Sequence, residues 1–339
     1  MDKVFCFGEV MLRFSPLLHR EWIRHAAIPV YIAGAELNVA SALAKWKVPV
    51  KYCTALPDNY MARELVQDTD ARGIDTSSVI YSGNRLGIYY LPQGGDLKSE
   101  GVIYDRTHSS FAELQPGTIN WNEMLKDVSW FHFSAITPAL NENTAAICKE
   151  ALVAASAKDI TISVDLNHRA KLWKYGKQPD EVMPALVDYC DVVMGNIWAA
   201  NSLLGIPVDE NIHAKKSKEA YLQHAEQTSQ AIRKQFPKTR SVANTFRFSQ
   251  GEKGVLYYAA LHASGEQHVS AEYSSASVIN QIGTGDCFMA GLIYGMHNGH
   301  TPSDTINFAA AAAFGKMNEA ADATDQQAEA VRSVMQSYE

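Results

Sequence analysis

The feature of this 339-residue chain that most limits its fold is a regular alternation between short apolar runs and longer helical stretches. The strand-like runs are residues 4–7, 50–54, 130–133, 161–164, 192–194 and 241–245. The helical patterns cover roughly 35–46, 59–72, 142–157, 196–204, 217–235, 286–298, 303–318 and 325–337. Alternation of this kind favours an α/β fold, with a mainly parallel central sheet and helices on both faces.

The length of the chain is compatible with one large α/β unit. A chain of 339 residues could hold two average domains, but α/β units of this size often form a single one. Neither a flexible linker nor an internal repeat interrupts the pattern, and a hydrophobic content of 47% can bury a sizeable core. We therefore expect a single domain over residues 1–339.

Composition argues against several classes of protein. The net charge of −7 offers no basic face for nucleic acid. The five cysteines are odd in number, scattered and never arranged as C-x-x-C, which argues against a disulfide framework or a zinc site and for a reducing compartment. The longest small-apolar run is far shorter than a bilayer span. We expect a cytoplasmic protein without a membrane or nucleic-acid partner.

Two segments, residues 10–33 and 85–106, break the alternation. They hold short β-type runs at 87–91 and 101–104 with no helix between them, and residues 92–96 form a hairpin-type loop. We expect these segments to pair into a small sheet outside the main one. Such a sheet could serve as a lid over a site or as the contact of a homo-oligomer.

The junction at residues 283–286, Gly-Thr-Gly-Asp, is the strongest indication of function. A glycine-rich turn here becomes a helix, whose first N–H groups and positive dipole end form an anion site suited to phosphate. Asp286 would repel phosphate unless it takes a proton from the group that attacks the phosphorus. For an isolated Gly-x-Gly-Asp, a glycine turn with an acidic first helical turn is the simpler interpretation. No G-x-x-x-x-G-K-[ST] occurs, which excludes a P-loop enzyme.

Other candidate residues cluster at helix entries, on the small sheet and after strands. Gly34 would permit close approach of a ligand at a helix entry, and Asn38 could bind a hydroxyl, although for this motif alone an N-terminal helix turn that packs against the sheet is the favoured interpretation. Tyr104 and Arg106 lie on one face of a strand. Arg169 follows the strand at 161–164, where α/β proteins bind ligands. Two arginines that can each grip a carboxylate suggest an acidic substrate, although surface salt bridges are the usual fate of arginine.

The pairing of Gly34-Ala35-Glu36-Leu37-Asn38 with Gly283-Thr284-Gly285-Asp286 resembles the two signatures of the ribokinase-like (PfkB) carbohydrate kinases. The resemblance covers nearly the whole chain, and within the family it is strongest to kinases of 2-keto-3-deoxygluconate. The segments that carry this closer likeness are 8–9, 87–89, 104–106 and 165–173.

The resemblance implies a ribokinase-like three-layer α/β/α fold with a β-sheet lid, and ATP with Mg²⁺ as the phosphoryl donor. Asp286 would be the general base toward the C6 hydroxyl of 2-keto-3-deoxygluconate, and no residue would bind the metal directly. The anion hole would be formed by the N–H groups of Gly283, Thr284 and Gly285. The substrate would be bound by Gly34, Asn38, Tyr89, Tyr104, Arg106 and Arg169. The nucleotide would be bound by Asn196, Thr245, Gly251 and Gly254.

The chain departs from the family pattern at three places. Asn280 stands where the family usually has aspartate, which bears on a monovalent-cation site. Ala199 replaces the glutamate of an Asn-x-x-Glu motif linked to Mg²⁺. The Thr-x-Gly-x-x-Gly of the nucleotide site is present only loosely, from Thr245 to Gly254. Two alternatives therefore stay open: a kinase of a neutral sugar such as fructose, and a non-catalytic sugar or nucleotide sensor on the same fold.

Overall fold

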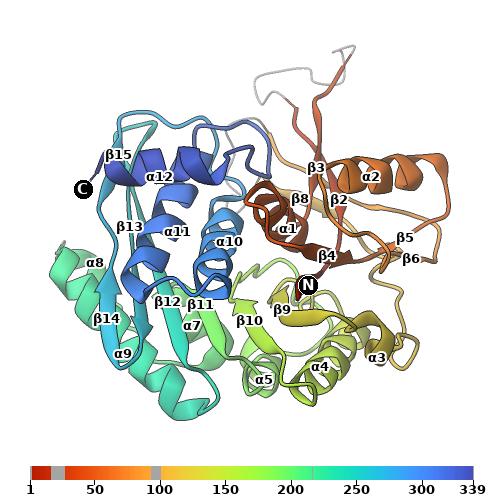
Figure 1. Ribbon diagram of the computed structural model, residues 1–339, viewed down its shortest axis with the longest axis horizontal. Coiled ribbons are helices and arrows are strands. Elements are labelled where there is room, and N and C mark those ends of the chain that lie inside the picture. The colour runs from red at the N-terminus through yellow and green to blue at the C-terminus, as the bar shows by residue number, and fades with distance from the viewer. Residues whose placement is uncertain (1, 17–26, 93–100, 216, 339) are drawn as a thin grey trace.

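A computed structural model describes residues 2–16, 27–92, 101–215 and 217–338 and places them around a nine-stranded central sheet (Figure 1). The strand order is β14-β13-β12-β11-β10-β9-β1-β4, with β15 paired to β13. These strands are β1 (Lys3–Phe7), β4 (Val50–Cys53), β9 (Val128–Ser134), β10 (Thr161–Asp165), β11 (Val192–Gly195), β12 (Ser241–Gln250), β13 (Gly254–Ala263), β14 (Glu266–Val269) and β15 (Tyr273–Ser275). All pairings from β4 to β12 are parallel, and β13 pairs antiparallel with β12, β14 and β15.

Helices cover both faces of this sheet, as the alternation predicts. The helices are α1 (Ala35–Lys45), α2 (Tyr60–Ala71), α3 (Trp121–Met124), α4 (Glu142–Ser156), α5 (Pro179–Val182), α6 (Pro184–Val187), α7 (Ile197–Leu204), α8 (Ile212–Lys215), α9 (Lys218–Gln235), α10 (Thr284–His297), α11 (Pro302–Lys316) and α12 (Ala328–Gln336). Helices α1, α10, α11 and α12 pack in one layer, and α4, α6, α7 and α9 in the other.

The first strand shows why two layers form. In β1, Val4 and Cys6 belong to the core beneath α1 and α10, whereas Phe5 and Phe7 belong to the core on the opposite face. Alternate residues of a strand point to opposite faces, so a strand that is apolar throughout must be covered on both. The three-layer α/β/α prediction is confirmed.

A separate four-stranded sheet stands beside the main one, in the order β3-β2-β7-β8. Its strands are β2 (Met11–Phe14), β3 (Val30–Ala33), β7 (Gly87–Tyr90) and β8 (Ile103–Asp105). The two outer pairings are antiparallel, and the central β2–β7 pairing is parallel because the chain between these strands passes through α1, β4 and α2. A third, two-stranded sheet pairs β5 (Ala55–Leu56) with β6 (Ile80–Tyr81).

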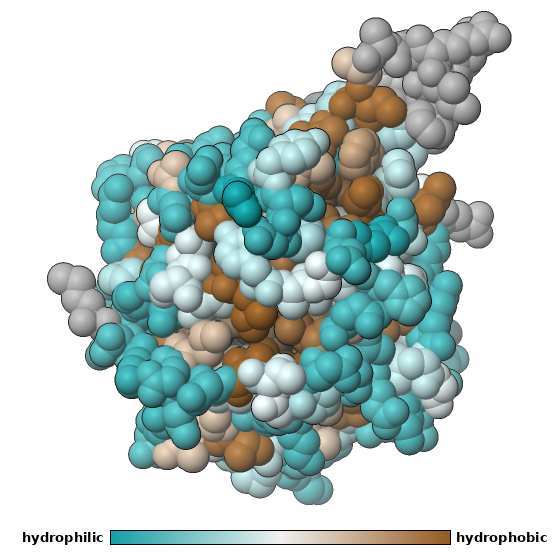
Figure 2. Space-filling view, turned by 90° about the vertical axis from the view of Figure 1, so that its right-hand side faces the viewer, coloured by the Kyte–Doolittle hydropathy of each residue, from teal (hydrophilic) through white to brown (hydrophobic). Residues whose placement is uncertain are grey.

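The β3-β2-β7-β8 sheet, here called the lid sheet, projects from the body of the molecule (Figure 1). Figure 2 shows hydrophobic side chains gathered along this projection, and Val30 and Ile103 are 47% and 62% exposed. Residues 17–26 of the expected lid, and most of its 92–96 loop, lie outside the described residues.

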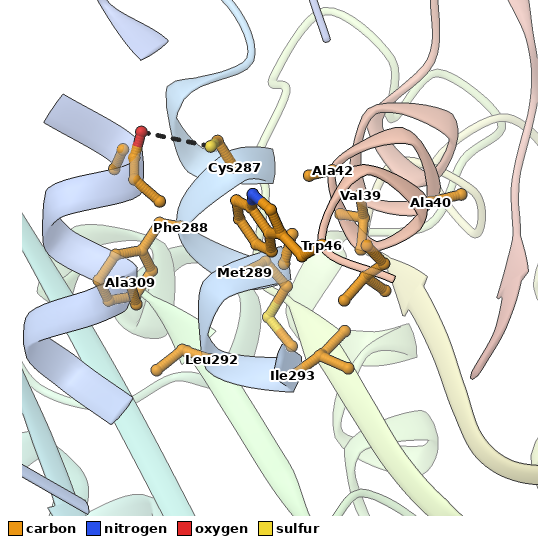
Figure 3. Packing of buried hydrophobic residues seen from close by; sticks show 14 of the residues in the cluster. Val39, Ala40, Ala42, Trp46, Cys287, Phe288, Met289, Leu292, Ile293 and Ala309 are labelled. Atoms are coloured by element: carbon orange, nitrogen blue, oxygen red, sulfur yellow. Dashed lines mark hydrogen bonds between the residues drawn. The ribbon is translucent and has the colours of Figure 1, made fainter. Parts of the chain in front are cut away.

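Helix α10, which begins within the Gly-Thr-Gly-Asp turn at residues 283–286, is packed between two other helices. Met289, Leu292 and Ile293 are fully buried, and Met289 and Ile293 lie on the side of α10 that faces Trp46 and the helix α1 (Figure 3). On its other side α10 crosses α11 so closely that a Cβ at Gly291 would overlap Ala309. A helix held on both sides can hold its N-terminal residues in a fixed position.

All five cysteines are buried and unpaired. Within the described residues, no helix combines the length and apolar character needed to cross a bilayer.

Candidate active site

Asp286 lies in the first turn of α10 and is buried, with 8% of its surface exposed. Its Oδ2 accepts a hydrogen bond of 2.7 Å from Asn38 Nδ2, across 248 residues of sequence. Asn38 comes from α1, which begins directly after Gly34. The two sequence signatures, far apart in the chain, therefore meet side chain to side chain.

The environment of Asp286 raises its pKa from 3.8 to about 7, chiefly because burial removes the carboxylate from water. The hydrogen bond from Asn38 and the charge of Arg169 oppose this increase, while the carboxylates of Glu36 and Asp322 add to it. A carboxyl group whose pKa lies near neutrality suits a general base, because it is ionised yet still accepts a proton readily.

The turn before Asp286 depends on glycine. Gly283 caps α10 in the left-handed region, with φ of 74° and ψ of 0°, which favours glycine. A Cβ at this position would collide with the carbonyl oxygen of Asp322. By contrast, a Cβ at Gly285 would meet nothing within 4 Å, since this residue lines an open cavity. The first N–H groups of α10 are thus accessible to a ligand at this turn.

We expect Gly283→Ala and Gly285→Ala to differ sharply in stability. The first should lower the free energy of unfolding by about 1–3 kcal/mol because it forces alanine into a strained backbone and against Asp322. The second should leave stability nearly unchanged and serves as the matched control. Urea unfolding followed by circular dichroism measures both, and equal stabilities would contradict the geometry described for this turn.

Two neighbouring cavities meet at Asp286. The larger, of about 510 Å³, is lined by residues 283–286 at one end and extends along the carboxyl ends of β10, β11 and β12. The smaller lies under the lid sheet. Asp286, Ile282, Tyr104, Asn167 and Arg169 line both. Groups bound in the two cavities can therefore meet at these five shared residues, one of which is Asp286.

The smaller cavity brings together all six residues expected at the substrate. Its lining includes Gly34, Asn38, Tyr89, Tyr104, Arg106 and Arg169. The lid sheet contributes the tyrosines, whose ring centroids are 6.0 Å apart. Alternation along β8 brings Tyr104 and Arg106 to the same cavity, which agrees with the spacing argument.

Arg106 and Tyr89 already have protein partners. The Arg106 guanidinium is buried against Glu9, with Nε donating to Oε2 at 2.8 Å. The Tyr89 hydroxyl donates to Asp322 Oδ2 at 3.0 Å, and Asp322 also accepts from Arg13 Nε at 2.9 Å. These buried pairs hold the cavity wall in shape. They also neutralise the arginine charges that would otherwise attract an anion.

Arg169 is placed differently. It is half-buried, and its Nη1 donates to the carbonyl of His168 at 3.2 Å. Its positive charge opposes the increase in the pKa values of both Asp286 and Asp165. Asp165 ends β10 and is 6% exposed, and burial followed by the charge of Asp286 raises its pKa well above the ordinary value. Arg169 thus provides positive charge where the two cavities join.

The four residues expected at the nucleotide divide into two groups. Asn196 and Thr245 line the larger cavity, and the Asn196 side chain also caps α7 by accepting from Ala199 N at 2.9 Å. Gly251 lies in the turn between β12 and β13, Gly254 is the first residue of β13, and neither is among the residues that line this cavity. Their glycine character has a local cause. Gly251 has φ of 65°, and a Cβ at Gly254 would overlap backbone oxygens.

Several residues of the site were not singled out by sequence reasoning. Glu9, Arg13 and Asp322 form its buried ion pairs, while Asp165 and Arg247 line the larger cavity. Glu9 and Asp165 could have been found, since they belong to the segments 8–9 and 165–173 that supported the resemblance. The partners of the ion pairs lie 97 and 309 residues apart, and no local pattern links them.

Comparisons with known proteins identify the family of this chain. Residues 1–318 match the family model described as pfkB family carbohydrate kinase. A crystal structure of 2-dehydro-3-deoxygluconokinase from Thermotoga maritima is 32% identical, with a TM-score of 0.88, and the match covers 99% of this chain and 100% of that one.

Two curated relatives are also similar. The 2-dehydro-3-deoxygalactonokinase of Haloferax volcanii is 30% identical over 171 residues, so that match spans half of this chain and 54% of the relative. The 5-dehydro-2-deoxygluconokinase of Geobacillus thermodenitrificans is 22% identical over 301 residues, which are 87% of this chain and 81% of the relative.

Proposed function

The chain belongs to the PfkB family of carbohydrate kinases, and we propose that it phosphorylates the C6 hydroxyl of 2-keto-3-deoxygluconate to give 2-keto-3-deoxy-6-phosphogluconate. The observation that carries this proposal is the meeting of Asp286 and Arg169 between the two cavities. Asp286 can accept a proton there, and Arg169 can bind the carboxylate of an acidic substrate. The 2-dehydro-3-deoxy sugar acids named for two of the relatives support this choice of substrate.

The proposed reaction is a direct transfer of the γ-phosphoryl group. The substrate hydroxyl, held beside Asp286, loses its proton to the carboxylate as its oxygen forms a bond to the γ-phosphorus. The bond between that phosphorus and the β,γ-bridging oxygen breaks, and ADP leaves with the bonding electrons. The N–H groups of Gly283, Thr284 and Gly285 stabilise the charge that develops on the equatorial oxygens.

The smaller cavity suits an acidic sugar for a specific reason. Arg106 is balanced by Glu9, and Arg13 is balanced by Asp322, so Arg169 supplies the charge for the substrate carboxylate. Arg106 lines the cavity and orients the substrate from its fixed position against Glu9. The hydroxyl groups of the sugar would be met by Asn38 and the two tyrosines.

Kinases of this family use ATP with Mg²⁺, and the larger cavity has a donor for the ion. Asp165 is a buried carboxylate whose pKa is raised partly by the neighbouring Asp286, a repulsion that a divalent cation would relieve. Mg²⁺ prefers oxygen ligands, keeps several waters and often takes only one or two carboxylates beside phosphates. Asp165 would hold the ion, which neutralises phosphate charge when bound. This role for Asp165 differs from the expectation that no residue would bind the metal directly.

We further propose that residues 1–339 act as one kinase domain whose lid sheet closes over the sugar. Tyr89, Tyr104 and Arg106 belong to or follow its strands, so closure would complete the cavity and exclude water that could hydrolyse ATP. The exposed apolar side chains of the lid sheet also suit a homo-oligomer contact.

A coupled assay of ADP release tests the function. The purified protein would be supplied with ATP, Mg²⁺ and, in turn, 2-keto-3-deoxygluconate, 2-keto-3-deoxygalactonate, 5-keto-2-deoxygluconate, fructose and ribose. We expect the highest kcat/KM with 2-keto-3-deoxygluconate. A preference for fructose would indicate a neutral-sugar kinase, and nucleotide binding without release for any acceptor would indicate a sensor.

The pH dependence of the reaction should depend on Asn38. Since Asp286 acts as the carboxylate, kcat/KM should rise as the pH passes about 7 and level off above it. Asn38→Ala removes a hydrogen bond that favours the ionised form, so the midpoint should move upward, by about one pH unit.

The matched control is Asn244→Ala. Asn244 is also a buried asparagine, but its amide donates to Ser229 and not to the site. A pH–rate profile of each variant makes the comparison. An unmoved midpoint in Asn38→Ala, or an equal shift in both variants, would contradict the role of Asp286.

A further inference from the structure

Lys316, the last residue of α11, is fully buried. A lysine at a helix C-terminus normally interacts with the terminal carbonyl groups while its ammonium stays in water. This one instead points beneath the anion-hole turn. Its Cε lies 3.4 Å from where a Cβ of Gly283 would stand. Within the described residues, its Nζ has one hydrogen-bond acceptor, the carbonyl of Glu319 at a long 3.4 Å.

The surroundings of Lys316 are acidic. Burial lowers the pKa of its ammonium group, and the charges of Glu319, Asp322 and Asp286 act in the opposite direction. Among the residues that the structure describes, Oε2 of Glu319 is buried and has no hydrogen-bond partner. Asp322 is already paired with Arg13, so removing the ammonium group would chiefly leave the charges of Glu319 and Asp286 less compensated near the turn that has to receive phosphate.

The segment after Lys316 is fastened to the loop that leads into the turn. The carbonyl of Met317 accepts from the N–H groups of Ile279 and Asn280, at 2.8 and 3.0 Å. Asn280 Nδ2 donates to the carbonyl of Ala320 at 2.9 Å, and its Oδ1 accepts from Ile282 N at 3.0 Å. A dissociable monovalent cation between these segments would need oxygen ligands. The neutral side-chain amide of Asn280 instead donates a hydrogen bond to one such oxygen, the carbonyl of Ala320.

We propose that Lys316 is a built-in cation that supports the anion hole from beneath and takes the place of a dissociable monovalent ion. It is a positioning residue, because it acts through Gly283 and the neighbouring amides. Its charge keeps the turn electropositive despite the carboxylates of Asp286 and Glu319. The inference rests on the kinase activity proposed above but not on the identity of the sugar.

Replacing Lys316 with methionine keeps most of the side-chain volume and removes the charge. We expect Lys316→Met to lower kcat by about 10- to 100-fold, somewhat less than the loss of a direct oxyanion donor, while KM for the sugar changes less than about threefold. The matched control is Lys45→Met, which removes a lysine from the last turn of α1. A kcat close to the wild-type value in Lys316→Met would overturn the proposal.

The dependence on monovalent cations gives a second readout, which a merely structural role would not change. Wild-type turnover should be the same in Na⁺, K⁺ and NH₄⁺ at constant ionic strength. In Lys316→Ala, which leaves space for an ion, K⁺ or NH₄⁺ should restore part of the lost kcat relative to Na⁺. A wild-type enzyme that requires K⁺ would overturn the proposal, and this measurement stands even if the variants fail to fold.

Failure of the proposed function can be told apart from failure of this inference. If the wild-type protein phosphorylates none of the acceptors, the kinase proposal fails. Thermal unfolding then still tests Lys316. We expect K⁺ or NH₄⁺ to raise the melting temperature of Lys316→Ala relative to Na⁺ and to leave that of the wild type unchanged. An equal response of both proteins would contradict a built-in cation.

Discussion

Asp286→Asn should lower kcat by about 10²–10⁴-fold, the usual contribution of a general base, while ATP affinity stays within about threefold. The substitution keeps the shape of the side chain and its contact with Asn38 but cannot accept the hydroxyl proton. Steady-state kinetics with the sugar acid and titration calorimetry with ATP make the comparison. Near-normal turnover would remove Asp286 from the mechanism.

Asp304→Asn is the matched control for this variant. Asp304 lies in the first turn of α11, as Asp286 does in α10, but it is exposed and bonded to Thr301. Both substitutions remove one negative charge near the positive end of a helix dipole. A loss of kcat only in Asp286→Asn would therefore assign the effect to chemistry and not to the stability of a helix.

Asp286→Asn should also be more stable than the wild type above neutral pH. The folded pKa of Asp286 is raised to about 7, so below pH 3.8 the group is protonated in both states and carries no penalty. As the pH rises toward 7, the unfolded chain ionises first and the folded state loses stability. Asp286→Asn avoids this cost, which we place at about 2–4 kcal/mol at pH 8. Urea unfolding at pH 4 and pH 8 measures it, and a variant less stable at pH 8 would contradict this sign.

Arg169→Met should distinguish acidic from neutral acceptors. Losing a charge-assisted contact costs about 1.5–3 kcal/mol, so kcat/KM for 2-keto-3-deoxygluconate should fall by about 10- to 150-fold. Turnover of a neutral sugar at the same enzyme, however slow, should change by less than about threefold. Parallel kinetics with both substrates test this expectation. Equal losses would refute a carboxylate contact.

Arg106→Met serves as the contrast because Arg106 is buried against Glu9. Removing one partner of a buried ion pair leaves an uncompensated charge, which typically costs about 3–5 kcal/mol of stability. We expect this variant to lose stability and to lose activity on both classes of substrate. The double variant Glu9→Gln, Arg106→Met should recover much of the stability, because neither member of the pair is then left charged.

The sequence predicts the central layers of the fold well, because they depend on local patterns. The apolar runs and the amphipathic stretches place β1, β4, β9, β10 and β11 and most helices within a few residues of their observed bounds. The antiparallel end of the sheet was not recognised. The prediction places Gly254 at the nucleotide site and no strand over residues 255–263, whereas residues 254–263 form β13, which is buried almost throughout.

The candidate site was predictable where it depends on backbone motifs. The glycines at 34, 283 and 285 and the aspartate they accompany are readable, since such turns have few sequence solutions. The charge balance of the site could not be predicted from such motifs. Whether an arginine faces a substrate or a carboxylate is decided by partners far away in the chain, as Arg106 with Glu9 shows. The burial of Lys316 has the same origin in tertiary structure.

The central claim is that a substrate hydroxyl lies between Asp286 and the γ-phosphate, with the sugar carboxylate on Arg169. A crystal structure with 2-keto-3-deoxygluconate and a non-hydrolysable ATP analogue tests it most directly. We predict the C6 oxygen within roughly 2.6–3.2 Å of an Asp286 carboxylate oxygen and the γ-phosphate against the amides of residues 283–285. A γ-phosphate bound away from this turn, or a sugar whose carboxylate faces Asp286, would contradict the account.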